Sequence, residues 1–404
     1  NIHYIMKKFF VSALMLAFAL SSVSAKDKKK TEDEGYVFTT VKELKITPVK
    51  NQNRTGTCWC FSTLGFLESE LLRMGKGEYD LSEMFIVSKN YKDKAEKFVR
   101  LHGELNYAQG GSFEDVLQAW KDYGIVPELV MNGLQYGEDM HVHNELESAS
   151  RAYLDEIIKN PNRKLSTAWK KGFDGIIDAY LGTAPEKFTY NGKEYTPKSF
   201  AAELGINPDD YVSLTSYTHH PFYSEFAIEV QDNWRWATSY NLPIDELMQV
   251  FENAINTGYT IAWGADVSEK GFTRNGIGII PDIESMERSG SDQDRWLGLS
   301  TSEKDAEIKK MMEKPCKELE ITQEMRQEAY DNYETTDDHG MQIYGIAKDQ
   351  TGKKFYMIKN SWGTDNKYKG TWYISENFVK YKTMNIVVHK DALPQAIKDK
   401  LHIK

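Results

Sequence analysis

The spacing of apolar residues changes along the chain, from a helical period in its first part to short strand-like runs in its last part. After Trp59, apolar side chains recur every three or four residues until Gly75 interrupts the run: Leu64, Leu67, Leu71 and Met74. Residues at this spacing lie on one face of a helix, so the pattern predicts an amphipathic helix that begins at or just after Cys58.

Two further helices are predicted in the first part. Residues 113–123 form an amphipathic pattern that Gly124 stops, and the run Asp80-Leu81-Ser82-Glu83 is a capping pattern that predicts the start of another short helix. Residues 130–255 mix long helical stretches with a polar, aromatic-rich portion around 190–240. We interpret this middle segment as a large insertion.

The last part of the chain is rich in β-branched and aromatic residues. Four short runs there predict strands: 259–263, 341–347, 354–358 and 371–374. The turn sequence at 349–352 separates the second run from the third, as a hairpin requires. A helical first part that faces a sheet-rich last part predicts the α+β class.

Composition and charge narrow the class of protein. The chain has 404 residues, of which 40% are hydrophobic and 27% charged, enough to bury the core of one large domain or two ordinary ones. Its net charge is −10, so it offers no basic face to a phosphate backbone. Nucleic acid is therefore not an expected partner.

The amino terminus predicts a signal peptide over residues 1–25. Lys7 and Lys8 precede an apolar run at 9–20, and Val23-Ser24-Ala25 offers small residues for cleavage. A membrane anchor is the alternative, but the run is shorter than the ~20 residues that a spanning helix needs. We interpret 1–5 as extra upstream residues and 26–40 as a polar mature terminus, and expect an exported protein, periplasmic or secreted.

Cys58 is a candidate nucleophile. The chain holds three cysteines, too few for a disulfide framework. A thiol at a helix amino terminus feels the positive end of the macrodipole, so we expect a lowered pKa for Cys58. Gln52 lies on the loop that enters this helix, where its amide and the backbone N–H of Cys58 can form an oxyanion hole.

A second group of candidate residues lies in the predicted hairpin. His339 precedes its first strand and Asn360 follows its second, so the two side chains are expected to be neighbours. The amide of Asn360 can hold the imidazole in one tautomer, and Trp362 can cover that hydrogen bond from water. His339 would then take the thiol proton.

Other histidines make weaker cases. His141 and His143 alternate as in a strand, but no third metal ligand is evident near them, and His219-His220-Pro221 has the pattern of a loop. No glycine-rich phosphate-binding loop follows a predicted strand. We expect neither a metal nor an organic cofactor.

Taken together, these motifs resemble the papain family of cysteine peptidases, and most closely its bleomycin hydrolase or aminopeptidase C branch. The motifs that carry the resemblance are Gln52, Cys58-Trp59, Leu81-Ser82-Glu83, Gly110-Gly111, Thr336-Asp337-Asp338-His339 and Lys359-Asn360-Ser361-Trp362-Gly363-Thr364. Thr55 stands where papain-like enzymes usually carry a disulfide cysteine, a departure that fits this branch. The resemblance implies a papain-like fold over residues 41–404.

The resemblance also implies site residues and an activity. Catalysis would fall to Cys58 as nucleophile, His339 as base, Asn360 as the residue that orients the base, and Gln52 as oxyanion donor. Peptide substrates would be bound by Gly110, Gly111, Trp362 and Lys404. The last of these ends a tail, residues 392–404, whose terminal carboxylate would meet the substrate amine inside a homo-oligomer, by resemblance a hexamer.

Three activities remain open at this point. The first is a thiol aminopeptidase that releases amino-terminal residues from peptides. The second is an endopeptidase or dipeptidyl peptidase with the same catalytic residues. The third is an inactive papain-fold binding protein, which would have no need of Gln52, Cys58, His339 and Asn360 together.

Overall fold

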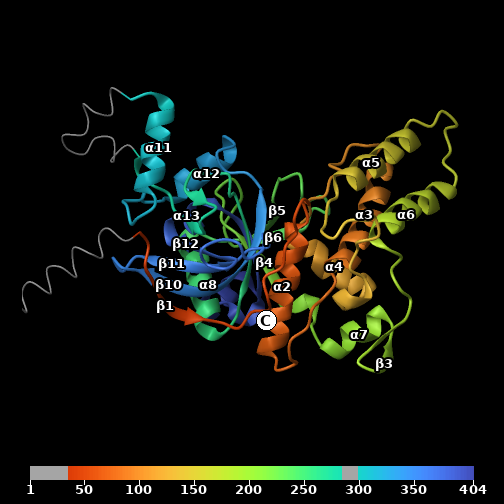
Figure 1. Cartoon of the computed structure of the whole chain (residues 1–404), viewed down its shortest axis with the longest axis horizontal. Helices are drawn as coiled ribbons and strands as arrows, with labels where there is room; N and C mark the ends of the chain where they lie inside the picture. Colours follow the sequence, from red (N-terminus) through yellow and green to blue (C-terminus); the bar gives the residue numbers. More distant parts are fainter. Residues whose placement is uncertain (1–34, 284–298) are drawn as a thin grey trace, which may run out of the picture. The chain divides into compact units, whose positions relative to one another are not determined.

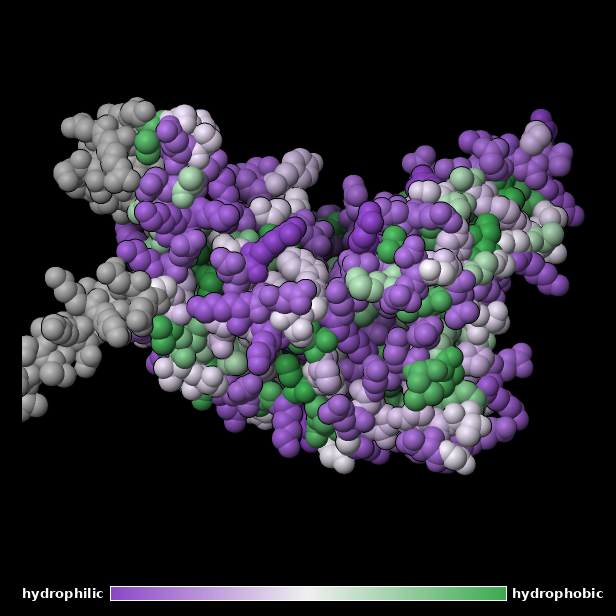
Figure 2. Space-filling model, in the orientation of Figure 1, coloured by the Kyte–Doolittle hydropathy of each residue, from purple (hydrophilic) through white to green (hydrophobic). Residues whose placement is uncertain are grey.

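The computed structural model describes residues 35–283 and 299–404. The predicted signal peptide lies outside these residues. Within them, no helix is both long and apolar enough to cross a membrane. On the face drawn in Figure 2, hydrophilic residues predominate and apolar residues form small separate groups.

The chain divides into two compact units, each described by itself. Among the described residues, the smaller unit comprises 35–39, 281–283, 299–319 and 348–354. It contains helix α11, Thr301–Met311, which begins with a capping box formed by Ser300 and Glu303. Lys353 donates hydrogen bonds to the carboxylate of Glu318 at 2.9 Å and to the carbonyl of Cys316 at 3.0 Å. Cys316 is a free thiol whose backbone carbonyl accepts one of these hydrogen bonds.

The larger unit begins with a group of helices. Figure 1 shows α3 to α7 together on one side of this unit, with α2 between them and the strands. Their bounds are α2 Cys58–Arg73, α3 Glu83–Arg100, α4 Phe113–Tyr123, α5 Asn144–Ile158, α6 Ala168–Leu181 and α7 Pro197–Leu204. One continuous apolar core joins these helices, from Leu64 and Leu67 in α2 to Phe173 and Ile177 in α6.

The sequence located these helix starts correctly but misjudged one length. The predictions at Cys58 and at 113–123 are confirmed. The helix expected to be short after Ser82 has 18 residues, so that prediction is wrong. The Ser82 hydroxyl caps it by accepting from the N–H of Phe85 at 3.0 Å. The helix extends because buried apolar residues continue along one face: Met84, Val87, Tyr91, Ala95 and Phe98.

An 11-stranded sheet forms the rest of the larger unit's framework. Its order is β5-β6-β4-β13-β7-β10-β11-β12-β9-β8, and β1 pairs with β10. The strands are β1 Phe38–Glu43, β4 Tyr211–Thr215, β5 Glu225–Ala227, β6 Thr238–Asn241, β7 Ile261–Ala265, β8 Phe272–Thr273, β9 Ile277–Gly278, β10 His339–Asp349, β11 Lys354–Lys359, β12 Thr371–Ser375 and β13 Thr383–His389. A separate hairpin joins β2, Phe188–Tyr190, to β3, Lys193–Tyr195.

Helices and turns complete this unit. They are α8 Ile244–Thr257, α12 Gln323–Asp331, α13 Glu376–Lys382 and α14 Gln395–Leu401, with short 3-10 turns at Glu128–Val130, Pro208–Asp210 and Lys390–Ala392. The α+β class is confirmed, because this helix group and this sheet are largely separate along the chain.

All four predicted strands are present, as β7, β10, β11 and β12. The sequence missed β13, the partner of β7, and β4, the partner of β13. β4 and β6 belong to the segment 130–255 and pair within the main sheet. The middle segment is therefore part of the larger unit's framework and not a compact unit of its own.

Candidate active site

Cys58 is the first residue of α2. The amides of Cys60 and Phe61 donate to the carbonyl of Thr57 at 2.9 and 3.2 Å. The first amides of a helix have no preceding turn to accept their hydrogen bonds, so they can bind a group placed at the helix start. The start of α2 packs closely on β10, because a Cβ at Gly340 would lie 3.3 Å from the α-carbon of Trp59. Glycine at 340 thus lets the thiol approach the strand that carries His339.

His339 and Asn360 meet as the hairpin prediction requires. The imidazole Nε2 of His339 lies 2.8 Å from Oδ1 of Asn360, which also accepts from the N–H of Ser361 at 2.7 Å. Both side chains are buried. Trp362 stacks on the imidazole with ring centroids 4.6 Å apart and covers this pair. With Nε2 bound to Asn360, Nδ1 is the nitrogen left to exchange a proton.

Cys58 and His339 line the same cleft, which has an empty volume of about 610 Å³. Its walls come from the starts of α2 and α4, from the loop around Asp232, and from the residues that flank β10. Four of its lining residues are acidic: Glu114, Asp232, Asp337 and Asp338. No lysine or arginine of the described chain lines it. Asp232 and Glu114 were not predicted from the sequence; the doublet Asp337-Asp338 before His339 was the available signal of an acidic cleft.

Gln52 is tied to the segment that carries Asn360. Its Oε1 accepts from the Ser361 hydroxyl at 2.6 Å, and its backbone N–H donates to the Ser361 carbonyl at 2.8 Å. Its Nε2 donates to the carbonyl of Thr55 at 2.7 Å, which leaves one of the two amide protons for another acceptor. The amide is thereby fixed on the loop that leads into Cys58.

The glycine pair forms one wall of the cleft. Gly111 lines it directly, and a Cβ there would lie 2.9 Å from the Trp59 ring and 2.8 Å from the Asp115 carboxylate. A Cβ at Gly110 would overlap the carboxylate of Asp232. The Trp59 ring therefore restricts position 111 to glycine, and the wall beside Gly110 is occupied by an acidic side chain.

The protonation of the site differs from the expectation. Burial raises the pKa of the Cys58 thiol to about 12, the charges of Asp337 and Asp232 act in the same direction, and the backbone N–H groups of Gly340 and Trp59 oppose them. The prediction of a lowered thiol pKa is thus wrong, because loss of water and the charges of two carboxylates outweigh the two backbone N–H groups. Burial also lowers the pKa of His339 to about 4, despite the bond to Asn360.

Lys404 does not take the place that the resemblance implies. In the described chain, no residue after Asn385 lines the cleft. The tail instead folds into α14, which buries Ile397 and Leu401, and Lys400 bonds to Glu246 of α8 at 2.6 Å. This burial of apolar residues holds the tail against α8, and Lys404 does not line the cleft of the described chain. Its contact with substrate stays a prediction from the resemblance.

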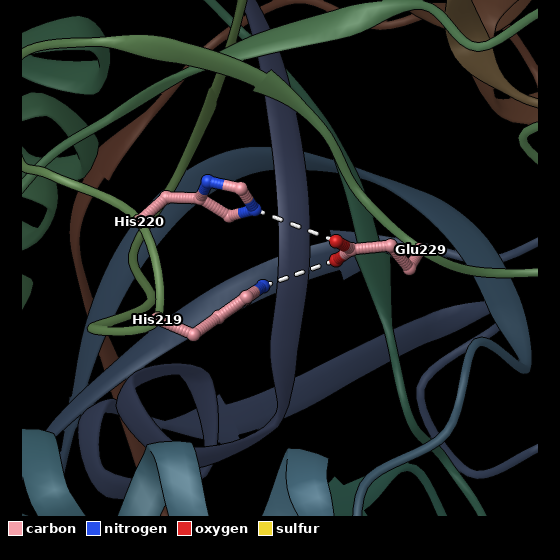
Figure 3. A group of neighbouring side chains, drawn as sticks. All are labelled: His219, His220 and Glu229. Carbon is pink, nitrogen blue, oxygen red and sulfur yellow. Dashed lines mark hydrogen bonds and ion pairs between the residues drawn. The ribbon is translucent and has the colours of Figure 1, made fainter.

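The sequence offered His141 and His143 as weak candidate metal ligands and predicted a loop at His219 and His220. His143 is fully buried and neither of its ring nitrogens has a hydrogen-bond partner in the described structure. His219 and His220 lie in the turn after β4, as expected, but their rings face the carboxylate of Glu229 (Figure 3). The three ligand atoms of this second group lie within 4.8 Å of one another, so this group offers donors for a cation.

Comparisons with known proteins agree with this geometry. The profile described as "Papain family cysteine protease" matches residues 37–170, and the profile described as "Peptidase C1-like family" matches 316–404. Aminopeptidase C of Lactococcus lactis subsp. lactis strain IL1403 is 23% identical over 397 residues, 87% of this chain and 83% of its own. Aminopeptidase G of Lactobacillus delbrueckii subsp. lactis is 23% identical over 426 residues, 88% and 84% of the two chains.

A solved structure supports the fold. The crystal structure of PepW from Lactobacillus rhamnosis HN001 is similar with a TM-score of 0.69 at 20% identity, over 93% of this chain and 86% of that chain. The two family profiles cover the segments that carry Cys58 on one side and His339 with Asn360 on the other. The chain therefore belongs to the papain family of cysteine peptidases, in the branch that holds aminopeptidase C.

Proposed function

We propose that this protein is a cysteine aminopeptidase, which releases amino-terminal residues from peptides through a thioester on Cys58. The observation that carries the proposal is the meeting, in one cleft, of Cys58 at the start of α2 with His339, whose Nε2 is held by Asn360. The names of the aminopeptidase relatives support the choice of exopeptidase over endopeptidase.

The first half of the reaction forms the thioester. Sγ of Cys58 attacks the scissile carbonyl carbon while its proton passes to Nδ1 of His339. The carbonyl oxygen takes up the negative charge, and the backbone N–H of Cys58 and the free amide proton of Gln52 stabilise it. His339 then protonates the leaving amine as the C–N bond breaks.

The second half restores the enzyme. His339 removes a proton from a water molecule, which attacks the thioester carbonyl, and the thiolate of Cys58 leaves and is reprotonated. Asn360 keeps the imidazole in one orientation through both halves, and Trp362 keeps water from their hydrogen bond.

The test uses two fluorogenic substrates that differ only in a free or an acetylated amino terminus. Cleavage of the free-amine substrate alone, lost in Cys58→Ala, is the expected result. Equal or better cleavage of the acetylated substrate would establish the endopeptidase alternative. If neither substrate nor a peptide library is cleaved by folded protein, the inactive papain-fold alternative applies.

Export and assembly are part of the same proposal. The charged and apolar pattern of residues 1–25 supports export, which amino-terminal sequencing of protein from the periplasm or medium would test. Release of a protein that begins near Lys26 is expected. Assembly as a homo-oligomer rests on the family relationship, and light scattering of the purified protein would measure it.

A further inference from the structure

The acidic groups of the cleft are not equally provided with partners. Asp338 accepts from the N–H of Ser268 at 3.1 Å and from the Thr336 hydroxyl at 2.7 Å. Asp232 accepts one long hydrogen bond, from Asn106 at 3.3 Å, and Asp337 accepts none from the described residues. No described cation lies within ion-pair distance of either. These two carboxylates therefore face the cleft beside Cys58 with capacity to bind a cation.

The position of Asp232 is set by firm contacts around it. Asn233 donates from Nδ2 to the carbonyls of Ile228 and Ala237 at 3.1 and 3.0 Å, which closes the loop on itself. Arg235 donates to the carboxylates of Asp93 in α3 and Asp115 in α4 at 2.7 and 2.8 Å. The loop is thus anchored to two helices, and Asp232 is presented to the cleft from a fixed backbone.

The same side chain closes one end of the cleft. Because the Asp232 carboxylate lies against the α-carbon of Gly110, an extended peptide that runs along Gly111 cannot continue past Gly110. A substrate must therefore end there, and the group that ends a peptide at its amino terminus is an α-ammonium. Two carboxylates at a closed end form a site of the right charge for it.

We propose that Asp232, with Asp337 beside it, binds the α-ammonium group of the peptide substrate and so selects free amino termini. This inference rests on the proposed aminopeptidase function and names the residues that give it its specificity. It assigns that role to the loop at residues 228–237, in place of the tail that ends at Lys404.

Binding of the ammonium also bears on the nucleophile. The charges of Asp232 and Asp337 both raise the pKa of the Cys58 thiol. The side chain of Asp337 is exposed, but the surrounding protein partly desolvates its carboxyl. This desolvation and the charge of Asp232 raise the pKa of that carboxyl. A bound ammonium neutralises this negative charge, so the thiol loses its proton more readily with a free-amine substrate in place.

The experiment compares wild type, Asp232→Asn and the control Asp139→Asn on the free-amine and acetylated substrates. The control removes the same charge at an exposed position that lines neither the cleft of Cys58 nor the adjoining pocket lined by Asp232 and Asp337. Loss of a hydrogen bond to a charged group predicts a fall of about 10- to 100-fold in kcat/KM on the free-amine substrate, largely through KM. Cleavage of the acetylated substrate is expected to hold or rise, and Asp139→Asn is expected to match wild type.

The outcomes distinguish the role of Asp232 from the aminopeptidase activity itself. If wild type prefers the free amine and Asp232→Asn keeps that preference, the role of Asp232 is refuted while the aminopeptidase stands. If wild type shows no preference, the aminopeptidase proposal itself is refuted. Should Asp232→Asn fail to fold, as judged by its melting curve, Asp337→Asn replaces it: a reduced preference supports the ammonium site and an unchanged preference overturns it.

A second inference rests on a different group, His219, His220 and Glu229. Nε2 of His219 and Nε2 of His220 lie 3.0 and 3.4 Å from the two carboxylate oxygens of Glu229, and both rings turn toward that carboxylate (Figure 3). Ligands about 2.1 Å from a tetrahedral ion are separated by roughly 3.4 Å. The spacing therefore suits a small divalent cation that prefers imidazole.

Neighbouring side chains hold the two rings in place. Nδ1 of His219 lies 3.4 Å from Oε1 of Gln327, an acceptor for its proton that leaves Nε2 free to bind a metal, and the ring stacks with Tyr330 at a centroid distance of 5.5 Å. His220 stacks on Phe226 at 4.2 Å. Such outer partners fix the orientation of metal-binding imidazoles. We infer that these three residues form a site for Zn²⁺ or a similar cation.

Equilibrium dialysis against Zn²⁺ tests this site on protein whose Cys58 is blocked with iodoacetamide. The expected result is one Zn²⁺ per chain that is lost in His220→Ala and kept in the control His102→Asn, an exposed position. His102 has a φ of 56°, which asparagine tolerates. Equal zinc content in His220→Ala and wild type would overturn the site and leave the residues as simple ion pairs.

Discussion

Nε2 of His339 lies 2.8 Å from Oδ1 of Asn360, although 21 residues separate them in the sequence. The contact exists because β10 and β11 are neighbours in the sheet and His339 opens the first while Asn360 follows the second. It leaves Nδ1 as the proton-exchanging nitrogen in the cleft of Cys58. The catalytic geometry thus depends on the pairing of two strands.

Replacing Asn360 with alanine tests this relationship. Without its orienting amide the imidazole samples other orientations, so kcat is expected to fall roughly 10- to 1000-fold with little change in KM. Steady-state kinetics on the free-amine substrate measure both constants. Asn332→Ala, an exposed position after α12, serves as control. An unchanged kcat in Asn360→Ala would argue against the assigned orientation.

The alkylation of Cys58 by iodoacetamide should depend steeply on pH. Because burial raises the pKa of the thiol to about 12, the thiolate fraction grows about tenfold for each pH unit between pH 6 and 9. Mass spectrometry of the labelled peptide gives the rate at each pH. A plateau below pH 8 would instead indicate a preformed thiolate paired with His339.

Glycine is required at 111 for steric reasons. A Cβ there would lie 2.9 Å from the ring of Trp59 and 2.8 Å from Asp115, so Gly111→Ala is expected to cost about 1 to 3 kcal/mol of stability and to lower activity. Gly175, inside α6, has no atom within 4 Å of its Cβ position. Gly175→Ala is therefore expected to stabilise by up to about 1 kcal/mol in urea unfolding. The two substitutions are thus expected to change the free energy of unfolding in opposite directions.

Acid should destabilise the fold partly through His143. Burial lowers its pKa to about 3, so the folded protein keeps it neutral while the unfolded chain takes up a proton below its usual pKa of 6.5. Its contribution is fully present above pH 6.5 and is lost as the pH falls toward 3, by on the order of 5 kcal/mol. His143→Leu should therefore lose less stability than wild type between pH 7 and 4. Parallel curves in chemical denaturation would contradict this.

Removal of the last residues distinguishes the tail from the Asp232 loop. Residues 402–404 follow α14, and in the described chain no residue after Asn385 lines the cleft. Deleting 402–404 is therefore expected to leave the preference for free amino termini within about twofold, since no charge near Cys58 is lost. A shift toward internal cuts, seen by mass spectrometry of peptide products, would return that role to the tail.

Local patterns were sufficient for the elements that carry the catalytic candidates. The apolar period after Trp59 and the alternating runs around 341–347 and 354–358 predicted α2, β10 and β11, because each depends mainly on neighbours within a few residues. The hairpin then implied the meeting of His339 with Asn360. The length of α3 was misjudged because the capping motif marks where a helix begins and not where it ends.

The sequence by itself determined the α+β class, the candidate nucleophile and its hairpin partners, since these follow from local periodicity and motif spacing. Only the tertiary structure decided the acidic environment of the cleft and the position of the tail. Asp232 reaches Gly110 across 122 residues through a loop anchored by Arg235, and no local pattern records that contact. The high thiol pKa likewise arises from burial and from charges that only folding brings near Cys58.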